Sequence, residues 1–397
     1  MTAYKYLINN IRGDKIIWLV VFGLSAFSIL AVYSSTGMLA YKQQDGNTEY
    51  YVIKHAALLF AGIGMMYLAH LISYKYYSRF AQIILYISIP LLFYTLVFGS
   101  NLNEAARWIT LPVINLTFQT SDLARFALIM YTARMLSKKQ EKIKGFKEAF
   151  VPIILPIVLT CALIFPANLS TAAVLFFTCM LLMFIGRVNL KYIALTFGSG
   201  VAVLALVIAL SYVIPDVWRF GTWQNRVESF IDGGGEEDYQ VEQAKIAIAN
   251  GGIFGLGPGN SKQRNTLPHP YSDFIYAIVI EEYGLFGGII IIALYLVLLY
   301  RCIRIVAKAP NSFGAFLATG LGLSLTIQAF INMGVATNVL PVTGLTLPML
   351  SMGGTSIWFT SISVGIILSV SREIEIQELK NAESEHEDIL NNETAIA

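Results

Sequence analysis

Ten apolar runs, each close to the length of a membrane-spanning helix, constrain the fold of this chain more than any other feature. A helix that crosses a bilayer needs about 20 predominantly apolar residues. The runs lie at residues 16–37, 51–72, 80–98, 122–136, 150–166, 170–186, 192–214, 273–300, 313–335 and 354–371. Only 13% of the residues are charged, against about 25% in soluble domains. The sequence therefore predicts an all-α polytopic membrane protein with about ten transmembrane helices.

Lysine and arginine residues predict the orientation, because short cytoplasmic loops of membrane proteins are enriched in both. With the N-terminus inside, the inner segments hold 18 of the 27 Lys and Arg residues, and the outer segments hold 8. We therefore expect both termini in the cytoplasm and a large external loop, residues 215–272, between the seventh and eighth spans. Residues 1–372 form the predicted membrane domain, and the acidic segment 373–397 is predicted to be a disordered cytoplasmic tail.

Composition also limits the function classes. The net charge of +2 indicates no nucleic-acid partner. Cys161, Cys179 and Cys302 lie in apolar runs or at the end of one, without paired spacing, which favours small hydrophobic side chains over a disulfide framework. The four histidines are dispersed, so no metal-ligand cluster is visible. No cofactor is evident, and a role for a divalent cation stays open.

The first polar motif is Ala-Ala-Arg-Trp-Ile, which contains Arg107 and Trp108. A tryptophan suits the membrane interface, and the arginine beside it is a candidate phosphate contact. Asp122 and Arg125 follow one helical turn apart at the outer end of the fourth predicted span. Two readings of this pair remain open: mutual neutralisation by a salt bridge, or a functional role for ionisable residues within the membrane.

A glycine-rich segment, residues 250–264, precedes the eighth predicted span. Its glycines would let backbone amides approach an anion. It is not a nucleotide P-loop, because no Gly-Lys-Ser/Thr follows. A glycine-rich loop alone is weak evidence for an anion site. The cationic side chains of Lys262 and Arg264 beside it make it a candidate diphosphate site. The candidate substrate contacts in this segment are Asn260, Ser261, Lys262, Gln263 and Arg264.

Asp273 lies where the external loop enters the eighth predicted span. It either caps the helix backbone amides or acts as a general base at a dry cavity mouth. Glu281, eight residues later, lies on the same helical face about 12 Å deeper, which favours a site and makes Glu281 a candidate substrate contact. Pro, Gly and Thr residues between 341 and 356 cannot form a lipid-facing helix, so this segment must line a protein-bounded cavity; Thr346 and Ser351 are its candidate contacts.

Together these motifs resemble the shape, elongation, division and sporulation (SEDS) family of bacterial membrane proteins, over nearly the whole chain to about Arg372. The motifs are ARWI, QTSDLAR, GLGPGNSKQR, SDFIY with EEYG, and LTLP with GGTS. The glycine-rich segment and residues 344–348 are more similar to the division members of the family than to the elongation members.

The resemblance implies an inverting peptidoglycan glycosyltransferase of the bacterial inner membrane, acting at the division septum. Its substrate would be lipid II and its leaving group undecaprenyl diphosphate. The implied partners are a class B penicillin-binding protein, other divisome membrane proteins and the lipid bilayer. Asp273 corresponds to the essential aspartate of the family, and we assign it as general base.

The candidate diphosphate contacts, ranked from the first choice to the last, are Arg107, Lys262 and Arg264. Several positions depart from the family pattern: Tyr271-Ser272 replaces the commoner His-Thr, Arg125 a usual Lys, Asp122 a usual Glu, and Asn168 a common Asp. Arg125 is kept as a candidate substrate contact. These departures leave the role of Arg125 open.

Two other functions remain in competition. A transporter that flips a lipid-linked cell-wall precursor would also use broken helices and membrane acids, although carrier sites lie near the midplane. A non-catalytic division scaffold would need no carboxylate at position 273.

Overall fold

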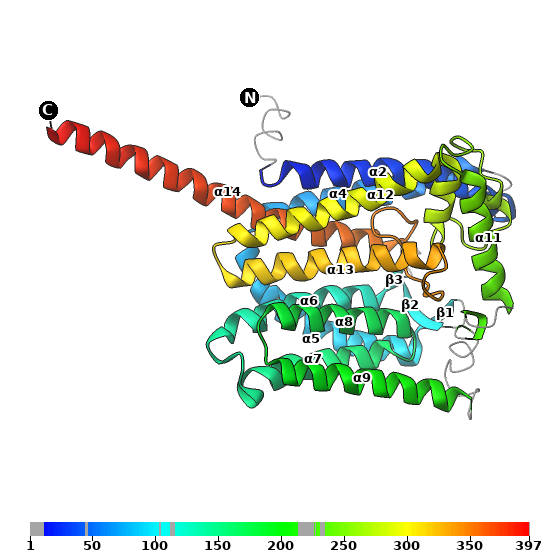
Figure 1. The fold of residues 1–397 in the computed structure, drawn as a ribbon, viewed down its shortest axis with the longest axis horizontal. Coiled ribbons are helices and arrows are strands. Elements are labelled where there is room, and N and C mark those ends of the chain that lie inside the picture. The colour runs from blue at the N-terminus through cyan, green and yellow to red at the C-terminus, as the bar shows by residue number, and fades with distance from the viewer. Residues whose placement is uncertain are drawn as a thin grey trace.

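The computed structural model describes residues 12–43, 47–102, 105–111, 116–212, 226, 228–230 and 235–396. Within these residues each of the ten apolar runs falls in a helix, and the long helices run side by side to form the body (Figure 1). The ten are α2 (Lys15–Ser35), α4 (Thr48–Leu71), α5 (Tyr74–Phe98), α6 (Thr120–Lys138), α7 (Val151–Ile164), α8 (Leu169–Ile185), α9 (Leu190–Ser211), α12 (Ile275–Lys308), α13 (Ser312–Ala336) and α14 (Thr355–Ile396).

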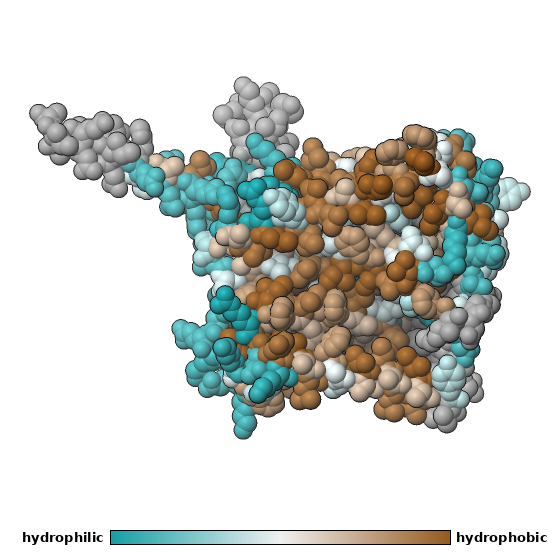
Figure 2. Space-filling view, in the orientation of Figure 1, coloured by the Kyte–Doolittle hydropathy of each residue, from teal (hydrophilic) through white to brown (hydrophobic). Residues whose placement is uncertain are grey.

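Eight helical segments in the described part of the chain are long and apolar enough to cross a membrane. The α8 helix is apolar but shorter, and α6 is the most polar of the ten. Figure 2 shows an apolar band across the visible face of the body, with hydrophilic side chains gathered at both ends. The predicted polytopic membrane fold is confirmed, whereas the count of ten spans stays a prediction.

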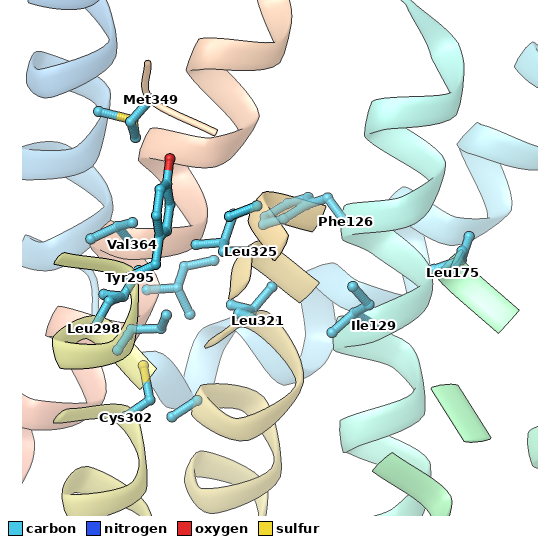
Figure 3. Packing of buried hydrophobic residues seen from close by; sticks show 14 of the residues in the cluster. Phe126, Ile129, Leu175, Tyr295, Leu298, Cys302, Leu321, Leu325, Met349 and Val364 are labelled. Atoms are coloured by element: carbon cyan, nitrogen blue, oxygen red, sulfur yellow. The ribbon is translucent and has the colours of Figure 1, made fainter. Parts of the chain in front are cut away.

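Burial explains why α6 tolerates polar residues. The apolar part of α9 is only 6% buried and lies at the periphery, whereas 61% of the equivalent part of α13 is buried. Figure 3 shows Phe126 and Ile129 of α6 facing Leu325 and Leu321 of α13. All four side chains belong to one continuous core cluster or pack within it. Polar residues on α6 and α13 therefore face other protein groups, with which they can form hydrogen bonds, and do not face lipid.

The two ends of the helical body differ. One end holds both termini of the described chain, as predicted, together with the short helices η1 (Gln140–Lys142) and η2 (Phe146–Phe150) (Figure 1). Ion pairs join helices there, including Arg301–Asp14 at 2.6 Å and Lys308–Glu378 at 2.9 Å. The opposite end, called the loop end below, carries a small sheet, α11 and the long connections.

The small sheet at the loop end was not expected from an all-α reading. Its antiparallel strands are β1 (Ser100–Leu102), β2 (Ala105–Leu111) and β3 (Leu116–Gln119), with β2 in the middle. The Phe118 ring packs edge-on against Phe359 at 5.7 Å, which holds β3 against the start of α14. Residues 105–111 include Trp108, Ile109 and Thr110, aromatic and β-branched residues that are enriched in strands.

The segment after residue 372, which the sequence predicts to be a disordered cytoplasmic tail, is helical in its described part. The α14 helix continues without a break to Ile396 and extends beyond the body (Figure 1). The segment contains no Gly or Pro after Gly365 and is rich in Glu, Leu, Ala and Ile, so nothing in it interrupts a helix. Lys75 also pairs with Glu373 at 3.0 Å, which ties the first turn of the extension to α5.

Candidate functional site

The loop end begins with α11 (Gly235–Gly251), which crosses the ends of the long helices (Figure 1). It contains residues 239–250, in which apolar and polar side chains are spaced as in an amphipathic helix. The α11 helix leads into the glycine-rich segment and then into η3 (Gln263–Asn265). Residues 266–274 connect η3 to α12, so the two predicted site elements lie on one continuous segment at the loop end.

A kink in α12 holds the glycine-rich segment. Gly284 has a φ of 68°, a left-handed conformation inside the helix. A Cβ added at Gly284 would lie 2.2 Å from the Ile253 carbonyl oxygen, so only glycine allows this approach. The amides of Leu256 and Gly257 donate to the Glu281 and Glu282 carbonyls, each at 2.9 Å. The loop is therefore packed against the kink through its backbone.

The loop also closes around the Glu281 carboxyl group, which has no exposed surface. Its oxygens accept hydrogen bonds from the Ser261 hydroxyl, from the amides of Lys262 at 3.2 Å and Gln263 at 3.2 Å, and from the Asn250 side chain at 3.3 Å. The backbone amides that we expected to bind a diphosphate thus bind the chain's own carboxyl group. Direct substrate contact by Glu281 and Ser261, which the sequence predicted, does not agree with their burial.

Glu282 ties the same loop to α2. Its carboxyl group accepts from the Ser34 hydroxyl and from the Ser261 amide, the latter at 3.3 Å. The Arg264 guanidinium folds back over the loop and donates to the Gly259 carbonyl at 2.7 Å. This network makes the loop a rigid part of the fold.

The remaining predicted contacts of this loop differ in exposure. The Lys262 and Asn260 side chains are exposed, although the Asn260 amide donates to the Leu256 carbonyl at 3.2 Å. The Gln263 side chain is half-buried and accepts from the Thr266 hydroxyl. Of the candidate diphosphate contacts in the loop, the Lys262 ammonium group is the one that points into solvent with no ion pair inside the described chain.

Asp273 has a different environment. Helix α12 is capped by Phe274 with no side-chain hydrogen bond, so the capping interpretation of Asp273 is wrong. Its carboxylate is half-buried, and its one hydrogen bond within the described residues comes from the Ser272 hydroxyl at 2.9 Å. Most of its acceptor capacity is therefore open to a ligand. A Cβ added at Gly344 would lie 3.7 Å from Asp273 Oδ2, which places the 341–354 loop beside the carboxylate.

The 341–354 loop is non-helical and enclosed by protein, as its Pro, Gly and Thr content predicted. The Ser351 hydroxyl donates to the Ser272 carbonyl at 2.6 Å, and the Met352 amide donates to the Tyr271 carbonyl at 2.9 Å. Thr346 contributes its carbonyl to the Gln328 side chain at 2.8 Å. Burial raises the pKa of Tyr271, with smaller effects from Tyr51 and Asp273, so its phenol stays protonated beside the carboxylate.

Arg125 is buried between α6 and α13. It donates to the Gln328 side chain and lies 3.5 Å from an Asp122 oxygen. The pairing interpretation of Asp122 and Arg125 is confirmed, and direct substrate contact by Arg125 does not agree with its 7% exposure. Asn168 accepts from the Thr171 amide at 3.1 Å and caps α8.

The first motif lies in the sheet. Trp108 is half-buried on β2, opposite Ser100 and Gln119. The side chain of Arg107 is outside the described part of the chain, so its candidate role as a phosphate contact stays a prediction.

Two residues near the site were missed by sequence reasoning. Gln328 and Asn332 lie one turn apart on α13, are 2% and 1% exposed, and both contact the 341–354 loop. Two amide side chains at i and i+4 within an apolar run were a detectable signal, because buried amides in a membrane helix need partners.

Comparison with known proteins identifies the fold. Residues 14–376 match the family model of cell cycle proteins named for FtsW, RodA and SpoVE. The chain belongs to this family. It is 36% identical over 368 residues to a probable peptidoglycan glycosyltransferase FtsW of Geobacter metallireducens, covering 91% of this chain and 95% of the relative. It is 33% identical to stage V sporulation protein E of Bacillus subtilis, covering 90% of this chain and 97% of the relative.

Solved structures support the same fold for this family member. A chain from a complex described as a peptidoglycan synthase that coordinates polymerization and crosslinking has a TM-score of 0.71, with 23% identity over 91% of this chain and 98% of that chain. The rod shape determining protein RodA of Thermus thermophilus has a TM-score of 0.65, with 22% identity over 91% of this chain and 97% of that one.

Proposed function

We propose that this family member is a peptidoglycan glycosyltransferase that polymerises lipid II during cell division. The observation that carries the proposal is the Asp273 carboxylate at the loop end of a membrane-embedded body, half-buried and with a single hydrogen bond from the described residues. Relatives that match over most of the chain are named as probable peptidoglycan glycosyltransferases. The division role follows from their FtsW names.

The chemistry requires a base and an electrophile with a good leaving group. In our proposal Asp273 takes the proton from the acceptor sugar hydroxyl as that oxygen attacks the anomeric carbon of the donor. The bond from that carbon to the diphosphate oxygen breaks, configuration inverts, and the polyprenyl diphosphate leaves. Positive charge near the departing phosphates stabilises the transition state, and the exposed Lys262 ammonium group is the best placed of our candidates.

Arg264 and Arg107 are further candidate contacts for the diphosphate. Trp108 is a candidate contact at the membrane interface. Arg264 is half-buried and holds the Gly259 carbonyl, so it would act at the margin of the loop. We also include in the proposal a class B penicillin-binding protein that cross-links the product, other divisome membrane proteins, and a location in the inner membrane at the septum. Whether a divalent cation is needed for activity can be tested by adding Mg²⁺ to the assay described next.

The proposal is tested with the purified full chain in lipid vesicles supplied with lipid II, with and without a transpeptidase partner and Mg²⁺. We expect glycan strands, resolved by gel electrophoresis after lipid release. A flippase would instead move fluorescent lipid II across the vesicle membrane without making polymer. A scaffold would do neither, and either of these results would overturn the proposal.

A further inference from the structure

Asn332 joins two parts of the chain that meet at Asp273. Its side-chain nitrogen donates to the backbone carbonyl of Asp273 at 2.8 Å and to the Leu345 carbonyl at 2.7 Å. Both neighbours are acceptors, so the amide orientation is fixed by chemistry: nitrogen must face the two carbonyls. The side-chain oxygen has no partner within the described residues. Asn332 thus serves as a double donor, and its own acceptor is left unpaired.

The neighbouring turn of α13 repeats this arrangement. Gln328 donates to the Thr346 carbonyl at 2.8 Å and accepts from the Arg125 guanidinium. Because Gln328 and Asn332 are four residues apart, they project from the same helix face. They hold successive residues of the 341–354 loop, at positions 345 and 346, and α13 is itself among the most buried helices. The buried helix α13 therefore holds the 341–354 loop in a fixed position.

We propose that Asn332 is a positioning residue for Asp273, holding the proposed base and the adjoining 341–354 loop in a fixed relative geometry. This inference rests on the proposed function. One donor nitrogen sets the spacing between the backbone of residue 273 and the loop whose Gly344 borders the Asp273 carboxylate. Displacing a catalytic group by about 1 Å is enough to lower turnover roughly 100-fold. Asn332 touches no substrate itself and acts through Asp273.

The test substitutes Asn332→Leu, which keeps the approximate size of the side chain and removes both donors. The matched control is Thr326→Val on the same helix. Thr326 is 3% exposed, and its hydroxyl donates to the Gly322 carbonyl within α13 at 2.9 Å, away from the loop. Each full-length variant is purified in detergent, and melting temperature, kcat and KM for lipid II are measured. A third variant, Asn332→Gln, retains both donors on a longer arm.

We expect Asn332→Leu to lower kcat about 10- to 100-fold with a smaller change in KM, because the substitution displaces Asp273 and removes no candidate substrate contact. Thr326→Val should change both constants less than about twofold, and Asn332→Gln should give an intermediate kcat. If Asn332→Leu does not fold, Asn332→Gln decides: a kcat lowered at constant KM supports the role, and a wild-type kcat contradicts it.

An Asn332→Leu protein with the kcat of the Thr326→Val control would overturn the inference. A raised KM with an unchanged kcat would overturn it as well. Failure of the proposed function is distinguishable, since in that case the unmodified chain would form no polymer at all.

Discussion

Two carboxyl groups eight residues apart at the loop end show opposite environments. Glu281 has no exposed surface and accepts hydrogen bonds from four donor groups of its own chain. Asp273 is half-buried and accepts from the Ser272 hydroxyl alone within the described residues. A carboxyl group whose acceptors are all satisfied internally contributes to the fold, whereas one with open lone pairs can accept a proton from a ligand. Glu281 therefore contributes to the fold, and of these two carboxyl groups Asp273 is the one that remains open to a ligand, as the proposed general base must be.

The largest effect is expected from breaking the backbone contact beneath Glu281. Gly284→Ala would place a Cβ 2.2 Å from the Ile253 carbonyl oxygen and would force a φ of 68° on an alanine. We expect a loss of stability above about 3 kcal/mol, and little folded protein in size-exclusion chromatography of the detergent-solubilised chain.

Gly252→Ala is the matched control for this prediction. Gly252 also has positive φ, at 51°, but nothing lies within 4 Å of the added carbon. Its cost should be about 1–2 kcal/mol. Equal yields of folded protein from the two variants would contradict the packing of the loop against the kink.

Glu281→Gln should give the next largest change. One oxygen becomes an NH₂ group that faces donors from Ser261, Lys262 and Gln263, so at least one buried donor loses its partner. We expect a loss of about 2 kcal/mol in stability, measured as a lower melting temperature. Per folded molecule, turnover should stay within about threefold of the parent. A large loss of turnover at an unchanged melting temperature would assign Glu281 to the chemistry and break the comparison.

The smallest effect is expected at Lys262. Its ammonium group is exposed, and its amide still holds Glu281 whatever the side chain is. Lys262→Gln should leave the melting temperature unchanged and raise KM for lipid II about threefold, the range of an exposed charge contact. The increase should shrink at high ionic strength. A salt-independent KM, equal to that of the parent, would remove Lys262 from the diphosphate site.

How much the sequence could predict differs between these elements. The long helices fall on the apolar runs, because bilayer thickness and backbone hydrogen bonding leave few other solutions. The strand at 105–111 was not predicted, because its seven residues show no alternation of apolar and polar side chains and only its aromatic and β-branched residues favour a strand. The helical extension after residue 372 was read as disorder because its composition is polar, although it lacks any residue that breaks a helix.

At the candidate site the sequence indicated single residues, but it did not predict which partners those residues would have. Asp273 was recognisable from its motif and its place before a span. Whether Glu281 faced a substrate depended on the path of the glycine-rich loop, which folds back onto the α12 kink through contacts at Gly284. The roles of Gln328 and Asn332 depend on the tertiary contact between residues 345–346 and α13, which the local sequence does not specify.

The most direct measurement of the central claim is lipid II polymerisation by Asp273→Asn, compared with the parent at equal concentrations of folded protein. Asparagine keeps the shape of the side chain and its contact with Ser272, but it cannot take up the proton. We predict an unchanged melting temperature, retained lipid II binding, and a rate at least about 100-fold lower. A folded Asp273→Asn protein that polymerises lipid II within a few-fold of the parent rate would contradict the account.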